Sequence, residues 1–423
     1  MRRLRPSLRA SAPVIAIAAA ISIPASSAPP SGPETQVWID VSTHNMAGMP
    51  DMGGLGRFAM GMMGGKGAEL TYPSARYAAM TGQYLDIALH NSLKPGVEAA
   101  DAIPPGLKLG KSLPLVPPTP QSTARGEPGA PGQLPEGQIT VLEYWGCGAA
   151  VRPGQPKQLT VQSKGGSITA SGGISAGKFA PDRDIDATPA FAVWPNRKHG
   201  KRVPDGASLA GPHQISGDGV PASLKFELGR NADFMPKIAL STRGQASDAI
   251  TVEWQPVDRA KAYFLTAFAM QDKSTIVLWS SAETGGAGQG LMQYLTGSYI
   301  DRWLKEKVLL APSATSCTIP KGIFAAAGNA PGEGGMGGMG MLGMIAYGPE
   351  TNLVWPPKPT DPKEALEWDP EWNVRVRTKS TASAMLGMDL SGVQVDQDSD
   401  SGDRKQEQES KGKKLLKGIL RNF

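Results

Sequence analysis

The stretch from Ala249 to Glu283 constrains the fold of this 423-residue chain more than any other part of it. Between Ile250 and Trp254 apolar residues alternate with polar ones, which is the pattern of a half-buried strand. Two further apolar runs, at 263–270 and 275–279, follow after short polar segments. The pattern predicts an antiparallel meander of three strands, in which five aromatic side chains fill one core: Trp254, Tyr263, Phe264, Phe268 and Trp279.

Short strand candidates recur through the rest of the chain from residue 138 to about 380. They are separated by segments rich in Gly, Pro, Asp and Ser, and no alternation of strands with helices is visible. A doubly wound parallel sheet is therefore not expected. The spacing predicts a mainly β protein with an antiparallel β-sandwich core, built as one sandwich or as two in tandem.

One segment, 290–310, has helical periodicity. Its apolar residues fall near a spacing of 3.6, charged residues occupy the other side, and Pro312 follows. Such a helix beside a sandwich most often covers a sheet edge or an open end of the core. We therefore predict one amphipathic helix that covers the sandwich.

Two resemblances bear on this interpretation. The run Val252-Glu253-Trp254-Gln255-Pro256-Val257, followed by Ala260, Ala262 and Tyr263, resembles the second and third strands of fibronectin type III domains. The resemblance implies a sandwich of the fibronectin type III or immunoglobulin-like kind, in which a Trp on one strand packs near a Tyr on the next. Other segments, such as YWGCG and VLWSSAE, are similar to uncharacterised exported proteins of Gram-negative bacteria, which implies a compartment and no activity.

The first 27 residues have the pattern of a secretory signal peptide. Four arginines up to Arg9 precede the apolar run Ala12–Ile23, and small residues follow it. The apolar run is too short for a membrane-spanning helix, which takes about 20 residues. The pattern predicts Sec-dependent export to the periplasm or cell envelope, with cleavage after Ser27.

The charge balance gives no reason to expect a nucleic-acid partner. The chain has 43 Lys and Arg against 38 Asp and Glu, and four of the arginines lie in the signal peptide. The mature chain is therefore almost neutral. No basic face with interleaved aromatic residues is visible in the sequence.

A Met- and Gly-rich loop is predicted at 44–65, inside an N-terminal β-containing segment that spans 28–112. His44, Met46, Met49 and Met52 could supply an imidazole and three thioethers, ligands that suit Cu(I) or Ag(I). The alternative is a flexible apolar loop in which Met is adaptable filler. A second Met- and Gly-rich loop is predicted at 331–344.

Two other segments are low in complexity. Residues 113–137 are rich in proline and predict an extended linker between the N-terminal segment and the main β region at 138–380. Residues 381–423 predict a disordered acidic tail. Its end, 411–423, is basic and apolar, so it is either an unstructured tail or a peripheral membrane contact.

No catalytic residue is assigned. The G-x-S-x-G motif at 173–177 lacks the buried strand and following helix of a nucleophile elbow, so we interpret it as a Gly-rich loop. Residues 396–407 resemble a calcium-binding loop, but Ser401 replaces the required glycine, and an acidic spacer is favoured. Whether the protein is an enzyme stays open, and a non-catalytic role is favoured.

The only two cysteines, Cys147 and Cys317, are predicted to form a disulfide. An oxidising compartment favours the pairing of an even number of cysteines. The alternative is two buried free thiols. A metal site shared by the two lacks neighbouring histidines.

Taken together, these patterns predict a non-catalytic cell-envelope binding or scaffolding protein. Its partner, a protein or a glycan, would be held by sheet edges and loops. Two alternatives stay open: a periplasmic Cu(I)- or Ag(I)-binding protein that uses the Met-rich loops, and a carbohydrate-binding protein, which the nine Trp permit.

Overall fold

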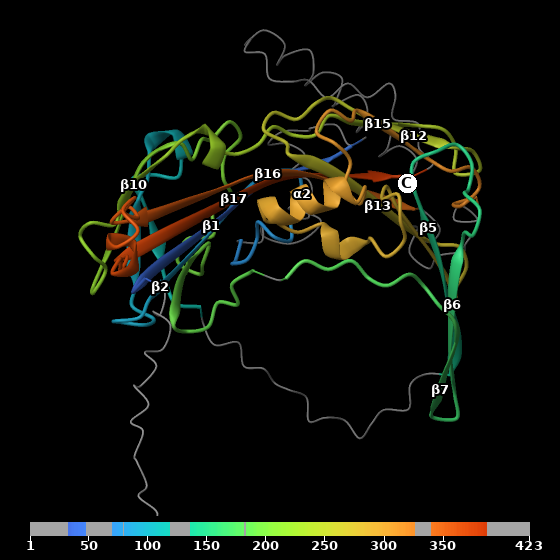
Figure 1. Ribbon diagram of the computed structural model, residues 1–423, viewed down its shortest axis with the longest axis horizontal. Coiled ribbons are helices and arrows are strands. Elements are labelled where there is room, and N and C mark those ends of the chain that lie inside the picture. The colour runs from blue at the N-terminus through green and yellow to red at the C-terminus, as the bar shows by residue number, and fades with distance from the viewer. Residues whose placement is uncertain are drawn as a thin grey trace, which may run out of the picture.

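The computed structural model describes residues 33–47, 70–78, 80–118, 136–181, 183–325 and 340–386. These residues are mainly β, as predicted, and their strands form three sheets of ten, four and three strands (Figure 1). The one α-helix among them is α2 (Gly297–Lys305). No helix in the described ranges is long and apolar enough to cross a membrane.

The largest sheet is mixed, with the strand order β7-β6-β5-β14-β13-β16-β17-β1-β2-β8. The pairs β1–β17 and β5–β14 are parallel, and the other pairs are antiparallel. The two longest strands, β16 and β17, extend through both halves of the molecule (Figure 1). The strands are β1 (Thr35–Met46), β2 (Gly82–Asn91), β5 (Gly137–Trp145), β6 (Lys157–Lys164), β7 (Ser167–Gly172), β8 (Phe191–Trp194), β13 (Ala262–Met270), β14 (Thr275–Ser280), β16 (Met341–Trp355) and β17 (Trp372–Met385).

Two smaller antiparallel sheets pack against one face of the large sheet. The four-stranded sheet has the order β10-β9-β3-β4, and the three-stranded sheet has the order β11-β12-β15. Val376 and Ala382 lie on the same face of β17, and each belongs to one of the two resulting cores. The strands are β3 (Ala99–Ala102), β4 (Ser112–Leu115), β9 (Gly211–Gly217), β10 (Lys225–Leu228), β11 (Leu240–Arg243), β12 (Ile250–Trp254) and β15 (Ser316–Ile319).

The opposite face of the large sheet carries α2. Ile300 and Trp303 of the helix pack with Phe264 of β13 and with Ile345 and Tyr347 of β16. This third core covers only the middle of the face. On one side of it the sheet face becomes charged, and on the other side it becomes exposed and apolar.

The predicted strands in Ala249–Glu283 exist, but the predicted meander is wrong. β12 pairs with β11 and β15, whereas β13 pairs with β14 and β16. The segment after Trp254 carries the chain from one layer to the other, because Arg259 adopts a left-handed conformation and the Tyr263 hydroxyl accepts a bond from the Val257 N–H. The Trp254 and Tyr263 rings still meet, 5.6 Å apart, across the two layers.

The helix is shorter than the predicted 290–310. The Thr296 hydroxyl accepts a hydrogen bond from the Tyr299 N–H, which caps the first turn of α2. Lys307 is in the left-handed region, so the helix cannot continue, and Leu310 instead pairs with Tyr263.

The segments 28–112 and 138–380 share one sheet, since β1 lies between β17 and β2. The predicted linker 113–137 contributes its first residues to β4 and its last to β5. The signal peptide, most of both Met- and Gly-rich loops and the tail beyond residue 386 lie outside the described residues.

Candidate functional site

Seven charged residues gather on the α2-bearing face of the sheet, beyond the helix. We call them the charge cluster. Side chains alternate along a strand, so three cations of β17 share this face with one carboxylate of β1 and one of β2. The members are Arg375, Arg377 and Lys379 of β17, Asp40 of β1, Asp86 of β2, and Arg76 and Asp184 of two covering coils.

The pair of Asp40 and Arg377 is the centre of the charge cluster. Arg377 donates from Nε to Oδ1 of Asp40 at 2.7 Å and from Nη2 to Oδ2 at 2.6 Å. Both side chains are almost fully buried. Burial raises the pKa of Asp40, but the charge and hydrogen bonds of Arg377 outweigh burial and hold the pKa below its ordinary value.

Asp86, directly opposite Asp40 in the register, has the reverse shift. Burial and the neighbouring charge of Asp40 raise the pKa of Asp86 to about 7, against the hydrogen bonds that it accepts from Ser74 and Ala75. Near pH 7, Asp40 is therefore ionised and Asp86 is partly protonated, although the two carboxyl groups are side by side in one buried site.

The coil between β7 and β8, which we call the strap (residues 173–181 and 183–190), covers this face (Figure 1). The Asp184 carboxylate accepts a bond from Arg377 Nη2 at 2.7 Å and lies 3.5 Å from Arg76 Nε. Arg375 donates to the Arg183 carbonyl at 2.8 Å, and Arg76 donates to the Ile185 carbonyl at 3.1 Å. The charge cluster thus ties the strap to the sheet.

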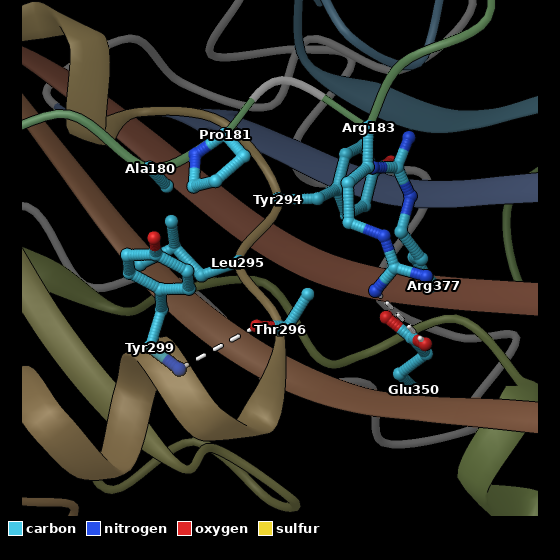
Figure 2. A pocket seen from close by; sticks show the side chains of 9 residues that line it. All are labelled: Ala180, Pro181, Arg183, Tyr294, Leu295, Thr296, Tyr299, Glu350 and Arg377. Atoms are coloured by element: carbon cyan, nitrogen blue, oxygen red, sulfur yellow. Dashed lines mark hydrogen bonds and ion pairs between the residues drawn. The ribbon is translucent and has the colours of Figure 1, made fainter. Parts of the chain in front are cut away.

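A small pocket opens between the strap, the N-terminus of α2 and Arg377. Figure 2 shows Arg183, Arg377 and Glu350 on one side of it and Tyr299 on the other. The Tyr294 ring has Arg377 Cζ 4.5 Å and Lys379 Nζ 4.6 Å from its centroid, which is cation–π geometry. The buried Tyr294 hydroxyl has no hydrogen-bond partner among the described residues.

Lys379 is fully enclosed. Its Nζ donates to the carbonyls of Arg76 (3.1 Å) and Met292 (3.5 Å) and to Gln293 Oε1 (3.3 Å). Burial lowers the pKa of Lys379 to about 8. Three acceptors around one ammonium group position this lysine as a structural cation, without an open approach for a substrate.

The shifted pKa of Lys379 predicts a pH dependence of stability. The folded pKa of about 8 lies below that of an unfolded lysine, so between pH 8 and 10.5 the unfolded state binds more protons and stability rises with pH. Relative to Lys379→Met, the native protein is expected to gain about 3 kcal/mol across this window. Urea unfolding at pH 7.5 and pH 10.5 measures it, and parallel pH profiles of the two proteins would contradict it.

A second candidate surface lies at the other end of the same face. The strands β5, β6 and β7, which we call the arm, extend away from the body of the molecule (Figure 1). Cross-strand partners place Ile139, Val161 and Ala170 in one row, with polar residues on the opposite face. Further apolar residues, which are exposed or half-buried, continue this face: Val141, Leu159, Ile168, Phe268, Met270, Ile276 and Leu278.

Among the described residues β7 is the edge strand of the arm, and every residue of it is exposed. Gly165 and Gly166 both have positive φ, the geometry of a two-residue hairpin. In a hairpin of this kind, alternate residues of β7 form hydrogen bonds with β6, and these are Ser167, Thr169 and Ser171. The bond from the Gly173 N–H to the Gln158 carbonyl continues the same alternation. The backbone groups of Ile168 and Ala170 therefore point outward.

The predicted metal ligands are only partly described. His44 and Met46 lie on β1 rather than in a loop, and Met49 and Met52 lie outside the described residues. His44 is buried with its Nδ1 2.8 Å from Thr381 Oγ1, and burial together with Lys379 lowers its pKa to about 4. Within the described ranges, no group of three or more His, Cys, Asp or Glu side chains is placed to hold a metal.

The two cysteines lie at disulfide distance, as predicted. Cys147 follows β5, and Cys317 lies on β15, so the bridge joins the large sheet to the three-stranded sheet. Nearby, the G-x-S-x-G motif lies in the strap, where the Ser175 N–H donates to the Glu143 carboxylate at 2.7 Å. No helix follows Ser175 within the strap.

The charge cluster was not predicted. Its sequence signal is faint: three cations alternate in one strand, at Arg375, Arg377 and Lys379, while Asp40 and Asp86 interrupt apolar strands. No family model matches this chain, and no curated protein and no solved structure matches it either.

Proposed function

We propose that this chain is an exported, non-catalytic binding or scaffolding protein of the cell envelope, which holds an extended segment of a partner protein against β7. The observation that supports the proposal is the arm, whose apolar face and outer edge are both exposed. The periplasmic location and the signal peptide belong to the same proposal. So does the finer fold: two small sheets facing the large one across two cores support a fibronectin-like sandwich.

Outer strands commonly carry Lys, Pro or a bulge, which discourage pairing with other chains. β7 reads Ser-Ile-Thr-Ala-Ser-Gly, with no charge and no proline, and its pairing with β6 is regular. An extended segment added beside β7 would bond to the outward groups of Ile168 and Ala170 and lay its alternate side chains on the apolar face.

Ala170→Pro tests the proposal, with Ala170→Ser as the matched control. Proline at this position removes an outward N–H and leaves the ladder to β6 intact, because Ala170 does not donate to β6. A photo-reactive amino acid at position 168 reports on the apolar face, and one at Thr169 reports on the polar face. In cells, we expect one dominant protein adduct from position 168.

Ala170→Pro should reduce the yield of that adduct about tenfold, because the partner loses one backbone hydrogen bond and also meets the proline ring. Ala170→Ser should leave it unchanged. Equal adducts from positions 168 and 169, or an adduct that is insensitive to Ala170→Pro, would contradict the proposal.

Three other hypotheses from the sequence stay predictions. Cu(I) or Ag(I) binding through His44, Met46, Met49 and Met52, carbohydrate binding, and a membrane contact through 411–423 each have their own direct binding assay. None of them draws support from the contacts of the described residues.

A further inference from the structure

The Asp184 carboxylate differs from the other two carboxylates of the charge cluster. Asp40 and Asp86 are fixed on paired strands, whereas Asp184 comes from the strap, which forms no ladder with the sheet. Its side chain is 14% exposed, and Arg76 and Arg377, which it contacts, are 4% and 6% exposed. Asp184 is therefore the least buried carboxylate of the charge cluster, and its ion pairs with Arg76 and Arg377 hold it against the sheet.

Without Asp184, the charge cluster carries a surplus of positive charge. Arg76, Arg375, Arg377 and Lys379 face Asp40 and Asp86, and the raised pKa of Asp86 keeps that carboxyl partly neutral near pH 7. In addition, Arg375 Nε is buried and has no hydrogen-bond partner among the described residues. Without Asp184, the guanidinium groups of Arg76 and Arg377 would each lose an anionic partner. Such a loss is costly because a buried charge needs a partner of opposite charge.

The pocket gives an approach to this site from solvent. It reaches Arg377 between Arg183 and Tyr294, and the capped N-terminus of α2 lines it through Thr296. Helix N-termini and arginine forks both favour oxyanions. Among the described residues, Glu350 is the one carboxylate that lines the pocket, and it lies 3.7 Å from the Arg183 guanidinium.

We infer that the charge cluster is a binding site for a carboxylate or phosphate group, in which Asp184 of the strap acts as an internal ligand. An incoming oxyanion would enter through the pocket, take the place of the Asp184 carboxylate on Arg377 and Arg76, and release the strap. This site is separate from the β7 edge and does not depend on the function proposed for it.

Asp184→Asn tests the inference, with Asp186→Asn as the control. Both changes remove one negative charge from the strap, but Asp186 is exposed and lies outside the charge cluster. The rise of the unfolding temperature is measured in sodium phosphate and in sodium acetate, each compared with sodium chloride at the same ionic strength. Removal of a competing internal ligand should raise the apparent affinity of the better anion about tenfold.

The preferred anion identifies the ligand chemistry: stabilisation by phosphate alone indicates a phosphate ligand, and stabilisation by acetate indicates a carboxylate. Anionic vesicles of phosphatidylglycerol separate a lipid headgroup from a small free anion. The inference is overturned if Asp184→Asn responds to these anions no more than Asp186→Asn does.

A second measurement uses the native chain, in case Asp184→Asn does not fold. Saturating phosphate or acetate should speed limited proteolysis within residues 183–190 and leave β17 uncut, because only the strap is released. Unchanged cleavage of the strap with both anions would also overturn the inference.

Discussion

Arg377→Met is expected to lower the free energy of unfolding by about 3–5 kcal/mol, since it leaves the Asp40 carboxylate buried without its main partner. Two hydrogen bonds of 2.6 and 2.7 Å are lost, and Asp184 loses its closest cation. Folding must then either bury a carboxylate whose remaining partner, Arg76, lies 3.5 Å away, or raise the pKa of Asp40 until it is neutral. Urea unfolding at pH 7 measures the change.

Arg230→Gln provides the control for this prediction. Arg230 bonds Asp258 at 2.7 Å, as short a contact as that of Arg377 with Asp40, but the Arg230 side chain is 76% exposed. An exposed ion pair contributes at most about 1 kcal/mol. Comparable losses in the two variants would show that burial of the charge cluster does not determine its energetic role.

Removal of the disulfide is the second change with a large expected effect. Cys147 and Cys317 are 170 residues apart, so the bridge closes a long loop of the unfolded chain. The chain-entropy relation gives about 5 kcal/mol for such a loop, an upper value because native strain commonly reduces it. Replacing both cysteines by Ser should therefore move the denaturant midpoint strongly, in oxidising buffer.

Thiol labelling provides the control for the disulfide. The denatured, unreduced native protein should take up no alkylating reagent, and the reduced protein should take up two equivalents. Reduction of the native protein should also reproduce the denaturant midpoint of the double Ser variant. Two labelled thiols without reductant would contradict the bridge.

Much of the secondary structure could be predicted, because strand patterns are local. The alternation at Ile250–Trp254 and the apolar runs after it correspond to β12, β13 and β14. Their pairing could not be predicted in the same way. Whether consecutive strands form a hairpin or change layers depends on the left-handed Arg259 and on partners such as β15 and β16, which are distant in sequence.

The disulfide and the charge cluster also differ in whether local sequence is enough to predict them. The disulfide could be predicted from the predicted compartment and from the cysteine count, which need no geometry. The charge cluster depends on register, since only the alignment of Asp40 with both Arg377 and Asp86 brings these side chains together. Alternating charges in a strand are typical of a solvated face, and nothing local shows that the strap covers this one.

The exposed apolar face of the arm is also a product of register. Ile139, Val161 and Ala170 come from three strands, and each strand alone has the alternation of a half-buried element. The alternation within one strand cannot indicate whether its apolar face receives a covering layer, because that depends on segments that are distant in sequence.

Amide hydrogen exchange at Ala170 tests the proposed function most directly. It is measured on the protein alone and together with the partner segment that cross-links to position 168. In the protein alone, the Ala170 amide should exchange almost without protection, while the amide of Thr169, which bonds to β6, is protected. The partner segment should slow exchange at Ala170 about tenfold or more. An Ala170 amide whose exchange rate is the same with and without the segment would contradict the pairing of a partner strand with β7.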